Sequence, residues 1–271
     1  MLPITSTKHG YILRKDGLFN LTIIAIANQK GGVGKTPSTV NLGAALARKG
    51  KRVLLVDADP QGSLTEYFLA DQADRLDVTI YNSMMKLEPI QTTVMSDLIA
   101  LLPAHDELSA AELELPAKPN AQKRLAKVLS FYDQEYCIID CPPSLGILTI
   151  NALAAADKVI IPVKTEIAAY RALKLIHRTI DEVRKSDLNT SLKIWGILPT
   201  LYDMRKGHHQ EMLQAIHDIY KAKVYPEVSK ESTKYNDACT IQSDVSVLDK
   251  NLGEYWDRLA TAVIEQEELG R

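Results

Sequence analysis

The chain has 271 residues, of which 46% are hydrophobic and 24% charged, and its formal net charge is −2. This length suits one large domain or two small ones with a sizeable core, and the near-neutral charge excludes a general basic field that would attract nucleic acid. Any binding to DNA must therefore come from a local basic patch.

The cysteines and the apolar runs indicate a reduced, cytoplasmic protein. Cys137, Cys141 and Cys239 form neither a C-x-x-C pair nor a disulfide framework. The first twenty residues contain no continuous apolar stretch, so we expect no signal peptide. No run approaches the ~18 apolar residues of a membrane span, so we expect no membrane partner.

Apolar runs and helical stretches alternate along most of the chain. The expected elements, in chain order, are a strand at 23–28, a helix at 38–49, a strand at 53–57, a helix near 79–85, a short strand at 98–102, helices near 106–113 and 121–130, a strand at 136–140, a helix at 145–155, a strand at 158–163, a helix at 167–185, a strand at 192–198, a helix at 207–220, a strand at 224–228 and a helix at 253–267. Continuous apolar strands joined by helices predict an α/β fold, with a mostly parallel twisted sheet and helices on both faces. We predict a single domain over residues 21–271 and an N-terminal extension at 1–20.

The stretch NQKGGVGKT, residues 28–36, lies between the first predicted strand and the first predicted helix. Gly31, Gly32 and Gly34 lack a Cβ, so the backbone can turn its N–H groups toward an anion. The following helix N-terminus adds unpaired N–H groups and a favourable dipole. The sequence therefore predicts a phosphate-binding loop of the P-loop NTPase type.

The residues that follow the glycines fit the same loop. Lys35 can reach the β- and γ-phosphates, and the hydroxyl of Thr36 is placed to bind Mg²⁺. Pro37 is tolerated because the N–H groups of a first helical turn have no partner inside the helix. The motif departs from the standard pattern, because Gln29 replaces its first glycine and Lys30 follows.

Three aspartates follow predicted buried strands. Asp57 and Asp59 stand two residues apart in VDADPQG, so both side chains are expected to face the crevice at the end of the sheet. Asp140 ends the run YCIID and precedes CPPS, an arrangement typical of a carboxylate that holds Mg²⁺. Pro142 and Pro143 are expected to stiffen the turn after it.

Four segments, ANQKGGVGKT, VLLVDADPQGSLT, IIDCPPSLGILTINAL and GILPTLYDMR, resemble those of ParA/Soj-type partition ATPases of the ParA/MinD superfamily. The resemblance covers most of the chain from about Thr22. It implies that ATP induces a homodimer in which Lys30 reaches the partner's nucleotide, and that Asp59 orients or deprotonates the attacking water. The predicted catalytic residues are Lys30, Lys35 and Asp59; the cofactor-binding residues are Lys30, Gly31, Gly32, Val33, Gly34, Lys35, Thr36, Pro37 and Pro142; the Mg²⁺ ligands are Thr36, Asp57 and Asp140.

The same resemblance implies non-specific binding to DNA in the ATP-bound dimer. Arg205 stands where the family has a DNA-contacting arginine, and Lys230 and Lys234 align roughly with a second basic segment. Phosphate contacts need only positive charge at suitable spacing, so lysine can serve there. A glycine-rich segment common late in the family is replaced by TIQSDVS at residues 240–246.

The family contains members of several functions. The acidic tail AVIEQEELGR disfavours the membrane-binding helix of MinD-like relatives. The favoured interpretation is a slow, Mg²⁺-dependent ATPase on the nucleoid, stimulated by a centromere-binding ParB-type partner, which segregates a plasmid or chromosome. Two alternatives remain open: a switch that positions a protein cargo, and a metabolic P-loop kinase or ligase.

Overall fold

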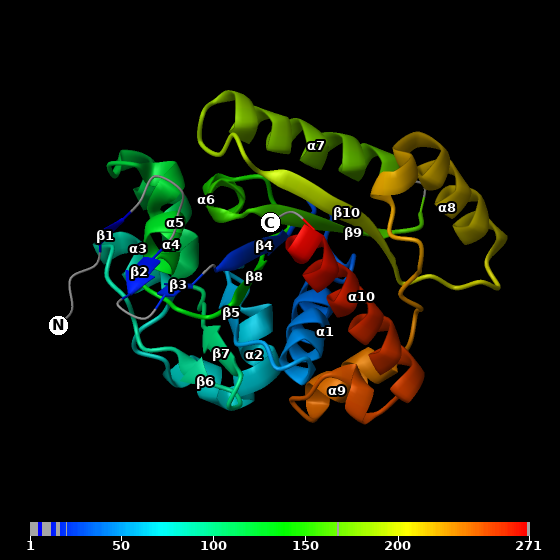
Figure 1. Cartoon of the computed structure of the whole chain (residues 1–271), viewed down its shortest axis with the longest axis horizontal. Coiled ribbons are helices and arrows are strands. Elements are labelled where there is room, and N and C mark those ends of the chain that lie inside the picture. Colours follow the sequence, from blue (N-terminus) through cyan, green and yellow to red (C-terminus); the bar gives the residue numbers. More distant parts are fainter. Residues whose placement is uncertain (1–4, 7–11, 15–16, 20, 167, 270–271) are drawn as a thin grey trace.

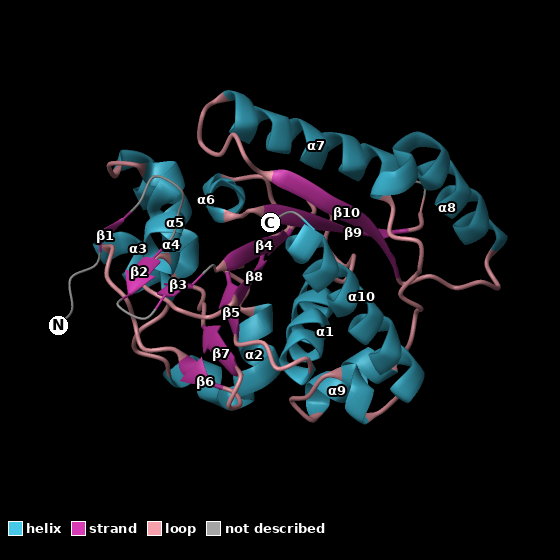
Figure 2. Ribbon diagram, in the orientation of Figure 1, coloured by secondary structure: helices cyan, strands magenta, loops and turns pink. Residues whose placement is uncertain are grey.

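A seven-stranded sheet forms the centre of the molecule in the computed structural model, which describes residues 5–6, 12–14, 17–19, 21–166 and 168–269. Its strands are β4 (Thr22–Ile26), β5 (Val53–Asp57), β6 (Thr93–Val94), β7 (Ile99–Leu102), β8 (Tyr136–Asp140), β9 (Lys158–Lys164) and β10 (Lys193–Thr200). The strand order is β10-β9-β4-β8-β5-β7-β6, and all neighbours are parallel except β6 and β7. The predicted α/β class with a mostly parallel sheet is confirmed (Figure 2).

Helices cover both faces of the sheet (Figure 1). They are α1 (Lys35–Arg48), α2 (Ser63–Leu69), α3 (Ile80–Lys86), α4 (Leu108–Glu114), α5 (Arg124–Leu129), α6 (Ile147–Ala155), α7 (Ala169–Lys185), α8 (Gly207–Tyr220), α9 (Lys234–Thr240) and α10 (Lys250–Leu269). Buried side chains of α1, α2, α9 and α10 form one apolar cluster with the sheet, and those of α3 to α8 form another. The sheet is therefore the middle of three layers.

The strand β4 shows why its apolar run is continuous. Ile24 and Ile26 pack into the cluster with α1 and α10, whereas Ala25 and Ala27 pack into the cluster on the opposite face. Successive side chains of a strand point to opposite faces, so a strand covered on both sides needs apolar residues at every position.

Within residues 21–269, the structure contains short elements that were not predicted, and it overturns one predicted strand. The short elements α2, β6 and α9 were not predicted, because none exceeds seven residues and periodicity is weak over so few positions. The predicted strand at 224–228 is wrong. This segment runs beside β10 with isolated bridges at Val224 and Lys230, and Pro226 between them has no N–H to donate to a ladder.

The described parts of the first twenty residues lie outside the main sheet. β1 (Thr5–Ser6), β2 (Ile12–Arg14) and β3 (Gly17–Phe19) form an antiparallel three-stranded sheet of their own. The assignment of 1–20 as an extension stays a prediction. The predicted start of the long helix at residue 167 lies outside the described residues. Among the helices described, none has the length and apolar character needed to cross a membrane.

The close packing of α10 gives a test of the fold. A Cβ added at Gly253 would lie 2.5 Å from Cβ and 2.9 Å from Cα of Ser246, so Gly253→Ala forces the backbone apart. We expect it to lower the free energy of unfolding by about 1–3 kcal/mol, as overpacking does. Gly207→Ala is the control, since no atom lies within 4 Å of its added Cβ. Urea unfolding that gives equal stability for both variants would contradict this packing.

Candidate ATP and magnesium site

The loop between β4 and α1 lies at the carboxyl ends of the parallel strands. Gly32 and Gly34 have φ angles of 68° and 84°, in the left-handed region that favours glycine. Two such turns bend the backbone around the start of α1, which begins at Lys35. The glycines therefore shape the loop as the sequence predicts.

Side chains from neighbouring strands hold the loop in place. The Asn28 amide donates to the carbonyl of Pro162 in β9 at 2.7 Å, and its oxygen accepts from the backbone N–H of Lys30 at 3.0 Å. The Thr200 hydroxyl at the end of β10 donates to the carbonyl of Val33 at 2.7 Å. Val33 is also buried, and its carbonyl, bonded to Thr200, holds the loop against β10.

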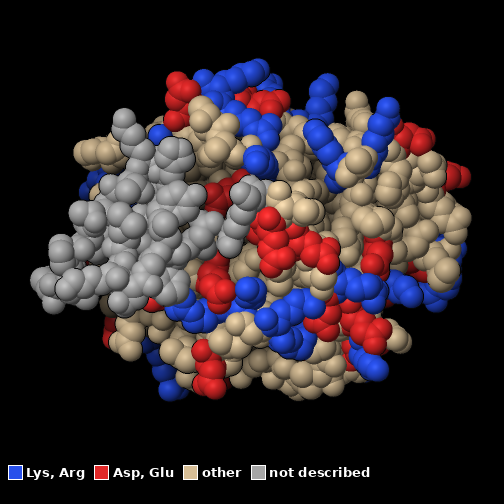
Figure 3. Space-filling view, viewed as in Figure 1, with Lys and Arg blue, Asp and Glu red and all other residues tan. Residues whose placement is uncertain are grey.

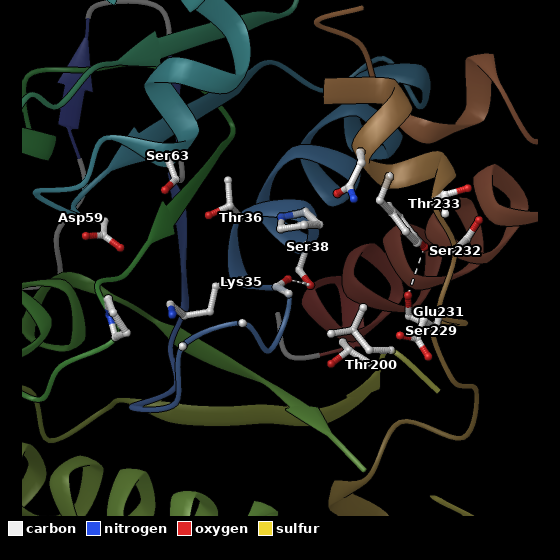
Figure 4. A pocket seen from close by; sticks show the side chains of 18 of the residues that line it. Lys35, Thr36, Ser38, Asp59, Ser63, Thr200, Ser229, Glu231, Ser232 and Thr233 are labelled. Atoms are coloured by element: carbon white, nitrogen blue, oxygen red, sulfur yellow. Dashed lines mark hydrogen bonds between the residues drawn. The ribbon is translucent and has the colours of Figure 1, made fainter. Parts of the chain in front are cut away.

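A cavity of about 540 Å³ opens in front of the loop. Its lining consists of Gly31, Gly32, Gly34, Lys35, Thr36, Pro37, Ser38, Asp59, Gln61, Ser63, Pro143, Thr200, Leu201, Ser229, Glu231, Ser232, Thr233, Tyr235, Asn236 and Trp256. In Figure 4, Asp59 lies at one end of this row and Ser229 to Thr233 at the other, with Lys35 between them. A cavity of this size, polar at both ends, suits a nucleotide.

Five predicted residues, among them the buried Val33, lie behind or beside the lining of this cavity. Asp57, Asp140 and Pro142 are buried, and Pro143 contributes to the lining instead of Pro142. Lys30 is not part of the lining either.

Asp57 and Asp140 face each other across two adjacent strands. They are register partners of β5 and β8, and both are buried. The Thr36 hydroxyl donates to Oδ2 of Asp140 at 2.6 Å, whereas Oδ1 of Asp140 is buried without a hydrogen-bond partner among the described residues. Asp57 accepts from both the N–H and the hydroxyl of Thr65 at 2.8 Å.

Burial raises the pKa of both carboxyls. The pKa of Asp140 rises to about 8, first because of burial and next because of the charge of Asp57. The pKa of Asp57 rises to about 6, again mainly through burial. A cation beside them would reverse this shift, because it favours the ionised form.

The donor set fits a magnesium ion bound together with phosphates. The free Oδ1 of Asp140 and the Thr36 hydroxyl are hard oxygen ligands of the kind that Mg²⁺ prefers. Among the described residues, no group of three or more His, Cys, Asp or Glu side chains could hold a metal alone. Mg²⁺ usually keeps several waters and takes further ligands from substrate phosphates, so one carboxylate and one hydroxyl from the protein can suffice.

Asp59 lies at the rim of the cavity with 9% of its surface exposed. Its backbone N–H donates to Asp57 Oδ1 at 3.1 Å, and its own Oδ1 accepts from the N–H of Gln61 at 3.0 Å. The turn DADPQG therefore aims one carboxylate at the cavity and keeps the other buried beside Asp140.

Lys30 points to its own chain in this structure. Its Nζ lies 2.6 Å from Oε2 of Glu166, and Lys164 approaches the other oxygen of Glu166 at 2.6 Å. The two lysines lower the pKa of Glu166 to about 2, Lys164 having the larger effect. The predicted contact of Lys30 with a second chain stays a prediction.

Two of the predicted DNA-contacting residues lie in segments that are joined just after β10: an isolated bridge pairs Tyr202 with Lys230, and Arg205 follows Tyr202 by three residues, whereas Lys234 begins α9. Their charges are mostly compensated. Arg205 forms two 2.9 Å hydrogen bonds to Asp203, Lys206 lies 2.9 Å from Glu231, and Lys234 lies 3.3 Å from Asp237. On the face seen in Figure 3, basic and acidic side chains are likewise interspersed.

Comparison with known proteins identifies the family. A family profile described as an AAA domain matches residues 21–194. The sporulation initiation inhibitor protein Soj of Bacillus subtilis is 42% identical over 222 residues, which cover 80% of this chain and 87% of Soj. The chromosome partitioning protein ParA of Caulobacter vibrioides is 37% identical over 256 residues, which cover 91% and 95%. The chain belongs to the ParA/Soj family of chromosome-partitioning ATPases.

Two solved structures with a similar fold contain nucleotides. Cobyrinic acid a,c-diamide synthase of Mycobacterium smegmatis, with bound ADP and magnesium, is 34% identical with a TM-score of 0.79 over 93% of this chain and 97% of that one. A putative plasmid partition protein of Borrelia burgdorferi bound to AMPPNP is 25% identical with a TM-score of 0.77 over 91% and 100%. ParA/Soj membership and a P-loop ATPase fold are thus consistent.

The raised pKa values predict an unusual pH dependence of stability. Because the folded pKa of Asp140 lies above its ordinary 3.8, the folded chain holds more protons than the unfolded chain between about pH 4 and pH 8, so nucleotide-free stability falls as pH rises through this window. Asp140→Asn removes the free-energy cost of ionising a buried carboxyl and keeps an oxygen that can accept the hydrogen bond from Thr36. At pH 8 we expect a gain of more than about 1 kcal/mol, since each pKa unit is worth about 1.4 kcal/mol.

Urea unfolding at pH 4.5 and pH 8 measures this effect. Asp71→Asn, at an exposed aspartate outside the buried pair, is the control. A gain for Asp140→Asn that does not grow with pH would contradict the assigned cause.

Proposed function

We propose that this chain is a Mg²⁺-dependent ATPase that works as a dimeric switch in the partition of a plasmid or chromosome. The observation that carries the ATPase is one cavity that joins the glycine loop, the rim carboxylate Asp59 and the Thr36–Asp140 pair behind it. Family membership supports the partition role.

The residues around the loop suggest how hydrolysis proceeds. Lys35 and the loop N–H groups would hold the phosphates, and Thr36 and Asp140 would hold Mg²⁺, which neutralises charge on the phosphate oxygens when bound. The carboxylate of Asp59 would orient the attacking water or accept its proton. Lys35 would stabilise the charge that develops toward the leaving phosphate.

The contact of Lys30 with Glu166 is compatible with a role of Lys30 in a dimer. Both side chains are about one-third exposed, and ion pairs of this kind contribute only about 0.2–1 kcal/mol. The triphosphate of a second chain carries several negative charges and would compete well for the same ammonium. Lys30 would then link dimerisation to the presence of ATP.

The compensated basic patch supports DNA binding that depends on the dimer. Near each other on one chain, Arg205, Lys206, Lys230 and Lys234 are opposed by Asp203, Glu231 and Asp237, so the local excess of positive charge is small. A single chain should bind phosphates weakly, whereas two linked copies on one DNA gain by effective concentration. A ParB-type partner would stimulate the ATPase and so release the DNA.

The likeness to the solved diamide synthase favours a second candidate, ATP-dependent activation of a small metabolite carboxylate. Such an enzyme would have no reason to bind DNA in response to ATP. A ParA-like switch that positions a protein cargo would bind DNA in the same way, and the identity of its protein partner would distinguish it.

Binding to DNA of mixed sequence, measured with ATP, with ADP and without nucleotide over a salt series, tests the proposal. We expect Asp59→Ala to bind only with ATP and to hydrolyse at least tenfold more slowly, since removal of a general base typically costs ~10²-fold or more. Lys35→Ala should bind neither ATP nor DNA. Equal DNA binding with and without ATP, or normal hydrolysis by Asp59→Ala, would refute the assignment.

Arg205 offers a separate test of the DNA-binding surface. Arg205→Gln should weaken ATP-dependent DNA binding and lower the salt slope by about 1, as expected for the loss of one phosphate contact, with ATPase activity retained. Arg178→Gln is the control, because Arg178 is an exposed arginine on α7 that is also paired with a carboxylate. Loss of affinity in both variants would indicate a general charge effect and exclude Arg205 as a contact.

A further inference from the structure

Glu231 touches both the nucleotide cavity and the basic loop after β10. It belongs to the lining of the 540 Å³ cavity, and Figure 4 shows it beside Ser229 and Ser232, at the end remote from Asp59. Its Oε2 accepts a hydrogen bond from Nζ of Lys206 at 2.9 Å. Glu231 therefore lies between the cavity and the basic loop.

Two backbone hydrogen bonds fix the position of Glu231. The N–H of Glu231 donates to the carbonyl of Tyr202 at 3.0 Å, and the N–H of Tyr202 donates to the carbonyl of Ser229 at 3.0 Å. The segment that lines the cavity is thus bonded to the loop that carries Arg205 and Lys206. Neither segment is free to shift alone.

The end of the cavity at Glu231 is suited to the nucleoside part of a nucleotide. In the proposed function, the glycine loop and Lys35, which lie between Glu231 and Asp59, hold the phosphates. Ribose hydroxyls and base amino groups are hydrogen-bond donors, and an ionised carboxylate only accepts. Apart from Asp59 at the phosphate end, Glu231 is the one carboxylate in the lining that the structure describes.

In the nucleotide-free chain, Glu231 is the nearer of two carboxylates that offset the charge of Lys206; the other is Asp203, whose Oδ2 lies 3.7 Å from Nζ of Lys206. The ammonium is 43% exposed and the carboxylate of Glu231 45% exposed, so the pair is held weakly and opens at small cost. Without Glu231, Lys206 keeps only the longer contact with Asp203, which also accepts two hydrogen bonds from Arg205, so more of the charge of Lys206 is available to a DNA phosphate.

We propose that Glu231 couples the two sites: a donor on the nucleoside takes its carboxylate, and Lys206 is then free to bind a DNA phosphate. By linkage, Lys206 must in turn oppose nucleotide binding by the same factor. The DNA half of this coupling rests on the proposed function, and the nucleotide half does not.

Calorimetry with ADP and Mg²⁺ tests the nucleotide half. Glu231→Gln should weaken ADP binding about three- to tenfold, since it removes a charged acceptor. Lys206→Gln should tighten it, by up to about fivefold, because the competing cation is gone. Glu227→Gln is the matched control, because Glu227 stands four residues earlier, pairs with Arg258 and is not part of the cavity lining. Unchanged ADP affinity in both test variants, or an equal change in Glu227→Gln, overturns the coupling.

DNA binding without nucleotide tests the other half. Glu231→Gln should bind DNA more tightly than the unmodified chain, and the slope of log affinity against log salt should steepen by about 0.9, the value for one more neutralised phosphate. Adding Lys206→Gln should abolish this gain. A gain that persists without Lys206, or no gain, contradicts the proposal.

The calorimetry and the DNA-binding experiment together distinguish failure of the coupling from failure of the proposed function. If the unmodified chain binds no DNA even with ATP, the proposed function fails, and the calorimetry still decides whether Glu231 and Lys206 compete for nucleotide. If the unmodified chain binds DNA with ATP but the calorimetry is flat, the coupling alone is wrong.

Discussion

The pairing of β5 with β8, in the register that sets Asp57 against Asp140, is the constraint on which the site depends. It buries two carboxyls side by side at the point where the glycine loop begins α1, and one carboxyl oxygen is left unbonded among the described residues. Such an arrangement is costly without a cation. The surrounding side chains of Thr36 and Thr65 reduce the cost by donating hydrogen bonds, and they also fix the geometry.

The parts of this site that are continuous in sequence could be predicted. The glycine loop, Asp59 and Asp140 follow buried strands whose apolar runs are unmistakable, and parallel strands bring their carboxyl ends to one edge of the sheet. The pairing of Thr36 with Asp140 across 104 positions follows from that rule. The α/β class was predictable for the same reason.

The contacts that depend on distant loops could not be predicted. The end of the cavity remote from Asp59 is lined by residues between Ser229 and Asn236, a segment without a motif of its own, and the Lys30–Glu166 pair joins positions 136 residues apart. The predicted strand at 224–228 shows a further limit: its apolar residues do lie beside β10, but Pro226 and the irregular bridges break the ladder. Composition alone gives no sign that the basic residues of the loop are already paired with acids.

The carboxylate of Glu166 is shared between Lys30 and Lys164. If Lys30 leaves for another chain, Lys164 remains, so Glu166 never becomes a bare charge at the edge of the sheet. Lys164 thereby lowers the cost of separating Lys30 from Glu166. In the proposed switch, which would form and dissolve a dimer in each cycle, this second lysine, two residues from Glu166 in the same segment, would keep the cost of releasing Lys30 low.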